Sequence, residues 1–153
     1  MKVILDASVL IEGLDHASPS APKAIELRQS LAKQDLQAPA LVVWETGNFV
    51  ARWVTKSTTE TAEDGSIALA GLTRFMAMEI PSIEAAARII RLTQDHGLTF
   101  YDANYLELAQ RDPSAILISN DGRLRDAAYK TLGKERVYDL AAAYERFVGK
   151  PFH

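Results

Sequence analysis

Short apolar runs alternate along the chain with segments whose apolar residues recur at helical spacing. The runs of β-favouring residues predict strands near residues 3–5, 115–118 and 136–138, with shorter strand or turn segments at 37–40 and 78–80. Helical spacing predicts helices over residues 7–12, 23–33, 41–50, 58–77, 83–94, 103–109, 123–132 and 140–148. Because strands that alternate with helices are joined by crossovers, the pattern predicts an α/β fold, with a parallel sheet between two layers of helices.

The most polar segment of the chain lies between residues 56 and 66. In it, Ser57 is followed three residues later by Glu60, a spacing typical of a capping box. We therefore expect a helix that begins near residue 58 and continues to 77. Together with the preceding helix it would form a helical hairpin rather than a linker between domains.

Composition and charge narrow the class of protein further. With 153 residues, of which 48% are hydrophobic and 24% charged, the chain is expected to form a single domain over residues 1–153. No run has the length of a signal peptide or a membrane span, so we expect a cytoplasmic protein that does not associate with membranes. The net charge of −3 means that binding to nucleic acid would require a local basic patch.

Three acidic residues follow strands or open helices. Asp6 ends the first apolar run, Asp121 follows the run at residues 115–118, and Asp102 stands at a helix start. Each alone is explained by helix capping. However, ligands of parallel sheets bind beyond the carboxyl ends of the strands, so the three acids together also predict a site at that edge.

Glu45 is a fourth acid, in the middle of the apolar helix predicted for residues 41–50. This helix is apolar almost all round, which predicts that it is buried and that the Glu45 carboxylate needs compensation. Helical spacing places Asn48 and Arg52 on the same stripe. An ion pair with Arg52, a solvent-facing stripe, or a functional site each account for the carboxylate.

The convergence of several carboxylates favours a bound cation. Carboxylates within a few ångströms of one another repel unless protons or a cation compensate their charge. Ligands that offer only oxygen suit Mg²⁺ or Mn²⁺. Zinc is disfavoured because the chain has no cysteine and its three histidines are far apart in sequence. No glycine-rich phosphate loop or nucleophile elbow is present in the sequence.

The four acids lie in segments that resemble the motifs of a known family. Asp6 lies in ILDASVL, Glu45 in WETGN, Asp102 in YDANY and Asp121 in ISNDGRL. In this order they resemble the four acidic motifs of PIN-domain ribonucleases, particularly the VapC-type toxins. The resemblance implies a three-layer α/β/α sandwich with a parallel sheet of about five strands. It also implies a divalent-metal-dependent endoribonuclease, the toxin of a type II toxin–antitoxin system.

The same resemblance assigns roles to individual residues. It implies that the four acids bind Mg²⁺ or Mn²⁺ and act in catalysis, with Asp121 bound directly or through water. Ser8 and Ser119 match hydroxyls that support these ligands, and Asn48 matches a polar helper near Glu45. Ser119 stands where the family often has threonine, which keeps the hydroxyl.

Arg123 and Arg125 follow Asp121 and are candidates for binding the RNA backbone. Arginines are also common on exposed helix faces, so their presence alone does not decide between the two interpretations. The alternatives to a ribonuclease are a catalytically inactive PIN-like domain that binds RNA or protein, and a metal-dependent phosphatase or DNA nuclease. Retention of all four acids argues against the inactive domain.

We also expect a homodimer and allow for an antitoxin partner. The amphipathic helices predicted for residues 56–77 and 82–94 carry a surplus of apolar residues, with which we count Phe75, Met76 and Met78. A surplus beyond what the sheet needs for cover is typical of a partner surface. Homodimers are also frequent in the family that the motifs resemble.

Overall fold

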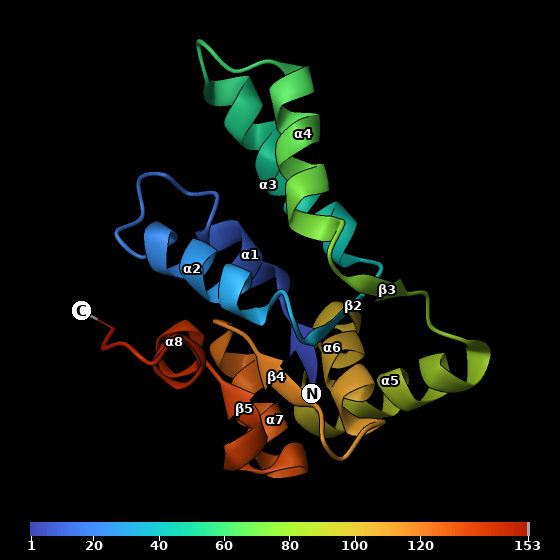
Figure 1. Ribbon diagram of the computed structural model, residues 1–153. Helices are drawn as coiled ribbons and strands as arrows, with labels where there is room; N and C mark the ends of the chain where they lie inside the picture. The colour runs from blue at the N-terminus through green and yellow to red at the C-terminus, as the bar shows by residue number, and fades with distance from the viewer. Residues whose placement is uncertain (153) are drawn as a thin grey trace.

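Five parallel strands form the centre of the protein in a computed structural model that describes residues 1–152 (Figure 1). They are β1 (Lys2–Leu5), β2 (Asp35–Pro39), β3 (Ala77–Glu79), β4 (Ile116–Ile118) and β5 (Val137–Tyr138). Their order in the sheet is β3-β2-β1-β4-β5, and every neighbouring pair is parallel. The predicted α/β fold with a parallel five-stranded sheet is therefore confirmed.

Helices form the outer layers. They are α1 (Ala7–Glu12), α2 (Ala21–Leu31), α3 (Val42–Lys56), α4 (Ala62–Thr73), α5 (Ile83–His96), α6 (Phe100–Gln110), α7 (Gly122–Leu132) and α8 (Leu140–Val148), with a 3-10 turn at Lys134–Arg136. Helix α6 packs on β1, β2 and β4 with α5 and α7 beside it, whereas α2 and α8 pack together (Figure 1). Within residues 1–152, no helix combines the length and apolar character needed to cross a bilayer.

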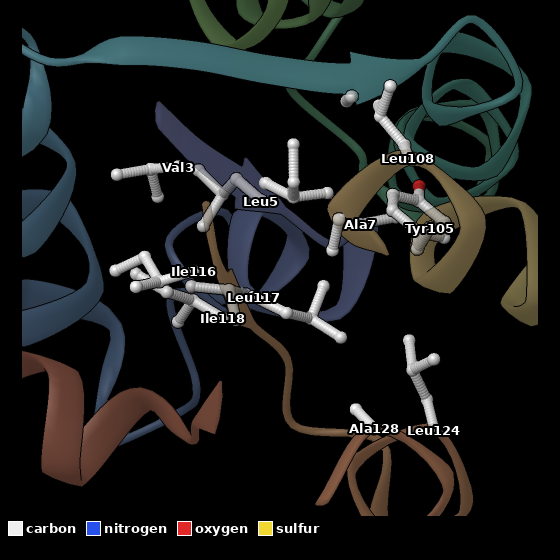
Figure 2. Packing of buried hydrophobic residues seen from close by; sticks show 14 of the residues in the cluster. Val3, Leu5, Ala7, Tyr105, Leu108, Ile116, Leu117, Ile118, Leu124 and Ala128 are labelled. Atoms are coloured by element: carbon white, nitrogen blue, oxygen red, sulfur yellow. The ribbon is translucent and has the colours of Figure 1, made fainter. Parts of the chain in front are cut away.

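The central strands are buried on both faces. Val3, Ile4 and Leu5 of β1 are almost inaccessible to solvent, as are Leu117 and Ile118 of β4. This is expected of a parallel sheet covered on both sides, whose strands read as continuous apolar runs. Figure 2 shows Val3 and Leu5 of β1 beside Leu117 and Ile118 of β4 in the core. The two strands therefore provide a rigid frame for the residues that follow them.

The second helix of the hairpin, α4, begins later than the sequence predicted. Helix α4 starts after Thr61, whose hydroxyl accepts the Asp64 amide while the Asp64 carboxylate accepts the Thr61 amide. The prediction of a helix that begins near residue 58 is wrong, because the hydroxyl of Ser57 accepts the amide of Glu60 within a turn instead. The hairpin of α3 and α4 extends away from the sheet (Figure 1).

Helix α3 is not buried all round, which also corrects the prediction. Its buried residues form a single stripe of Val42, Thr46 and Val50, whereas Trp44 is 67% exposed. The reason is that α3 packs mainly against α4 and α1 and leaves the sheet, so its remaining faces meet solvent. Glu45, next to the buried stripe, is partly buried.

Candidate active site

The strand order reverses between β1 and β4. From β1 the chain moves to β2 and β3 on one side, and β4 and β5 lie on the other side. Asp6 directly follows β1 and Ser119 directly follows β4. The Asp6 amide donates to the Ile118 carbonyl at 3.0 Å, which fixes the first acid beside the end of β4. This is the position at which open parallel sheets bind their ligands.

Asp6 is the N-cap residue of α1 by position, but its side chain does not cap the helix. Instead its Oδ2 accepts the hydroxyl of Ser8 at 2.5 Å and the hydroxyl of Ser119 at 2.6 Å. The Asp6 side chain is 5% exposed. Both serines contact the same carboxylate oxygen, so they orient Asp6 without bonding to Oδ1.

The two serines also connect Asp6 to the loop after β4. The Ser8 hydroxyl accepts the Asn120 amide at 2.9 Å, and the Ser119 hydroxyl accepts the Asp121 amide at 3.0 Å. Asp121 itself is a helix cap, because its Oδ1 accepts the Leu124 amide at 2.9 Å. The chain therefore holds Asp6 and Asp121 in one hydrogen-bonded network.

Glu45 is held by a residue that the sequence did not single out. The hydroxyl of Tyr105 on α6 donates to Glu45 Oε2 at 2.7 Å. Arg52 and Asn48 are both exposed on α3. Within residues 1–152, Arg52 forms no ion pair with Glu45, which rules out that interpretation, and Asn48 forms no hydrogen bond with it. The one side-chain hydrogen bond to the Glu45 carboxylate in this range comes from Tyr105. The only sequence signal for Tyr105 is its place three residues after Asp102.

Asp102 lies in the first turn of α6. The helix is capped by Thr99, whose hydroxyl accepts the Asp102 amide at 3.1 Å and donates to Asp102 Oδ2 at 2.7 Å. The prediction of an acid at a helix start is correct. A carboxylate in this position also interacts favourably with the helix dipole.

The four acids affect one another electrostatically. Burial raises the pKa of Glu45 to about 7, the Tyr105 hydrogen bond opposes this rise, and the charges of Asp6 and Asp102 add to it. Burial also raises the pKa of Asp6; the serine hydrogen bonds oppose that rise, and Asp102 and Asp121 add to it. In the described part of the chain, no lysine or arginine forms an ion pair with any of the four carboxylates. No cationic side chain in this part of the chain therefore neutralises their negative charge.

The donor set fits a hard divalent cation in its chemistry, because it offers only oxygen and carries uncompensated negative charge. It is not preassembled: across residues 1–152, no three acidic or histidine side chains lie in an arrangement that could hold an ion. The carboxylates are held separately, by serine, tyrosine and threonine hydroxyls and by a helix amide. The chain thus supplies oxygen ligands of suitable charge, but in residues 1–152 they are not arranged in the geometry of a bound ion.

The two arginines after Asp121 have different environments. Arg125 is partly buried, and its Nη1 donates to the Ser119 carbonyl at 2.9 Å. Arg123 is exposed and lines a shallow pocket that also includes His96 and Lys130. Arg125 therefore supports the loop at the end of β4, and Arg123 is the arginine more open to a ligand.

The fold and this edge of the sheet define an α/β protein with an acidic site at its topological switch point. The family model for the PIN domain matches residues 3–130, so the chain belongs to the PIN-domain family, whose members are generally nucleases. The motif resemblance is thereby confirmed.

Two solved structures share the fold. The crystal structure of PAE2754 from Pyrobaculum aerophilum is 19% identical, with a TM-score of 0.72, over 98% of this chain and 97% of that one. The crystal structure of FitAcB from Neisseria gonorrhoeae is 17% identical, with a TM-score of 0.59, over 90% of this chain and 97% of that one. A search of the curated proteins found no match.

Proposed function

We propose that this protein is a divalent-metal-dependent endoribonuclease that hydrolyses RNA phosphodiester bonds. The observation that carries the proposal is the group of acids at the switch point, where Asp6 interacts electrostatically with each of the other three. In residues 1–152 no lysine or arginine forms an ion pair with any of them. Membership of a nuclease family supports the same reaction class. A scaffold gains nothing from uncompensated carboxylates, whereas a cation site requires them.

In this proposal Asp6, Glu45, Asp102 and Asp121 hold Mg²⁺ or Mn²⁺. Such an ion, when bound, lowers the pKa of a water ligand and stabilises the developing charge on phosphate oxygens. Ser8 orients Asp6 through Oδ2. The exposed Arg123 binds the RNA backbone through local phosphate attraction, despite the acidic net charge.

Ser119 connects the two ends of the site. Its hydroxyl donates to Asp6 and accepts the Asp121 amide, and its carbonyl accepts Arg125. These bonds fix the position of Asp6, which follows β1, relative to Asp121 in the loop after β4. The role we propose for Ser119 and Arg125 is therefore to keep the loop after β4 in place while RNA is bound.

A catalytically inactive PIN domain that binds RNA or protein is the second candidate. One observation favours it: the acids in residues 1–152 are not arranged as a ready metal site. Metal binding separates the two candidates, because an inactive domain has no use for an ion at this edge.

We further propose that the protein is a homodimer and the toxin of a toxin–antitoxin pair. Large apolar side chains are exposed along α4, β3 and α5 and the segments that join them: Ile67, Phe75, Met78, Ile80, Ile83 and Ile90. Exposed apolar side chains gathered along neighbouring segments are typical of a protein–protein interface. Met76 does not belong to this surface, because it is buried in the core.

Incubation of the purified protein with RNA, in Mn²⁺ or in EDTA, tests the activity. We expect cleavage by the wild type in Mn²⁺, and none in EDTA or by Asp6→Asn. The matched control is Asp95→Asn, which removes an exposed carboxylate from α5 and should cleave normally. Parallel reactions with DNA and with a phosphomonoester distinguish a DNA nuclease and a phosphatase. Equal cleavage by Asp6→Asn, or failure of the wild type to cleave in Mn²⁺, contradicts the proposal.

A further inference from the structure

Tyr105 is the largest fully buried side chain in the described part of the protein. It lies on α6, and its ring packs beside Ala7 in the core (Figure 2). A buried phenol needs a hydrogen-bond partner for its hydroxyl. The partner is Glu45 Oε2 at 2.7 Å, on a helix 60 residues away in sequence. The hydroxyl therefore connects the base of the hairpin to the helix that covers the sheet.

The Tyr105 hydroxyl lies where the segments that carry the acids meet. Tyr105 is three residues after Asp102 and thus on the same side of α6. Ala7, beside the ring, directly follows Asp6. Glu45 is in the first turn of α3, which then extends from the sheet. Through one hydroxyl group, Glu45 is held against the body that carries Asp6 and Asp102.

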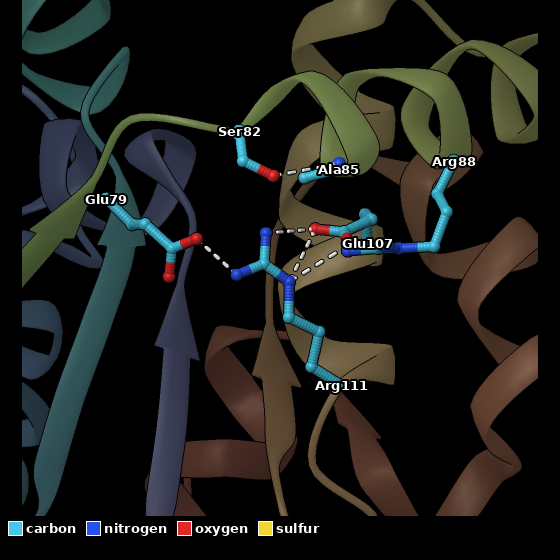
Figure 3. Close-up of polar contacts among 6 residues, drawn as sticks. All are labelled: Glu79, Ser82, Ala85, Arg88, Glu107 and Arg111. Carbon is cyan, nitrogen blue, oxygen red and sulfur yellow. Dashed lines mark hydrogen bonds and ion pairs between the residues drawn. The ribbon is translucent and has the colours of Figure 1, made fainter.

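Helix α6 also carries a buried acid, Glu107, whose charge is neutralised by ion pairs. Glu107 is 1% exposed and is bonded by two arginines, Arg88 and Arg111, the second of which also pairs with Glu79 (Figure 3). There the negative charge is neutralised by positive charge. Tyr105, two residues before Glu107 on α6, instead gives Glu45 on α3 a neutral hydroxyl donor.

A neutral donor and an arginine have different consequences for a carboxylate. Both orient it, but only the arginine removes its attraction for a cation. In residues 1–152, Glu45 has no ion-pair partner, and Tyr105 is bonded to only one of its two oxygens. The Glu45 carboxylate is thus oriented and still fully charged when it is ionised.

We propose that Tyr105 is a positioning residue that orients Glu45 for cation binding through the hydroxyl-to-carboxylate bond while leaving its charge available. This inference rests on the proposed metal-dependent function. A partner that orients a metal ligand typically changes metal affinity by 10- to 100-fold when it is removed. Tyr105→Phe removes the hydroxyl and keeps the ring that packs in the core.

The test measures Mn²⁺ binding by calorimetry and the Mn²⁺ concentration that gives half-maximal RNA cleavage. For Tyr105→Phe we expect the dissociation constant for Mn²⁺ and the half-maximal Mn²⁺ concentration each to rise about tenfold or more. The kcat at saturating Mn²⁺ should stay within a few-fold of wild type. The matched control is Tyr144→Phe, because Tyr144 is also buried and donates its hydroxyl to a glutamate, Glu26, at 2.6 Å. Its Mn²⁺ dependence should equal that of wild type.

The double variant Glu45→Gln/Tyr105→Phe separates positioning from packing. If the hydroxyl acts through Glu45, the double variant binds Mn²⁺ no more weakly than Glu45→Gln alone. A further loss in the double variant means that Tyr105 acts through packing, and this overturns the inference. Normal Mn²⁺ binding by Tyr105→Phe also overturns it and leaves the proposed function intact. A wild type that neither binds Mn²⁺ nor cleaves RNA overturns both.

Discussion

Replacing Glu45 with Gln should change the way in which the stability of the metal-free protein depends on pH. The pKa of Glu45 rises from 4.5 to about 7 on folding, first through burial and then through Asp6 and Asp102, against the Tyr105 hydrogen bond. An acid whose pKa is higher in the folded than in the unfolded state binds its proton more tightly when the protein is folded, so protonation stabilises the fold. Its contribution is complete below 4.5 and is lost as the pH rises through about 7.

The size of this effect follows from the two pKa values. Each tenfold change in proton affinity corresponds to about 1.4 kcal/mol, so the rise from 4.5 to about 7 sets an upper limit of roughly 3.4 kcal/mol. Glu45 is only partly buried, and solvent screening reduces this to about 1–2 kcal/mol. In a domain of this size that corresponds to roughly 3–6 °C in melting temperature.

The assay is thermal unfolding of wild type and Glu45→Gln in EDTA at pH 5 and pH 8. The variant keeps an acceptor for Tyr105 and cannot ionise. Because pH 5 is already above the unfolded pKa of 4.5, about three quarters of the effect falls between the two pH values. From pH 5 to pH 8 the melting temperature of the variant should therefore rise relative to that of the wild type by roughly 2–4 °C. Millimolar Mn²⁺ at pH 8 should reverse the order, because only the wild type binds the ion tightly. Parallel curves for the two proteins in EDTA would refute the reasoning.

Three further outcomes are expected. Asp6→Asn should raise the free energy of unfolding in EDTA by about 1 kcal/mol, because it removes a buried charge and keeps an acceptor; urea denaturation measures this, and a decrease would mean that the Asp6 charge stabilises the fold. Glu107→Gln should lower stability by about 2 kcal/mol, because it weakens buried bonds to Arg111, with Mn²⁺ binding unchanged in calorimetry. Light scattering at tens of micromolar protein should give a dimer, and Phe75→Glu should shift it to a monomer; a wild-type monomer would exclude this interface.

Much of the fold could be predicted because its strands and helix ends have local signals. The buried strand β4 is a continuous apolar run, and α8 lies over the predicted residues 140–148. The start of α4 could not be predicted, because Ser57 with Glu60 and Thr61 with Asp64 have the same capping spacing. In the structure the second pair forms the capping box, and the first forms a turn.

The candidate site was predictable to the level of its acids and serines and no further. Asp6 and Ser119 follow strands, so strand assignment alone brings them to one edge. Tyr105 has no such signal, because an aromatic residue inside an apolar helix segment is usually a core residue. That its hydroxyl contacts Glu45 depends on how α3 crosses α6, which is a tertiary contact between segments 60 residues apart.

The most direct test of the metal-dependent site compares RNA cleavage in Mn²⁺ by wild type, Glu45→Gln and Glu26→Gln. The control is matched because Glu26 also accepts a tyrosine hydroxyl, at 2.6 Å, but lies on α2. The amide of Glu45→Gln keeps volume and an acceptor and removes the charge that a hard cation needs. We predict that wild type and Glu26→Gln cleave RNA and that Glu45→Gln does not. Cleavage by Glu45→Gln at the wild-type rate would contradict the account.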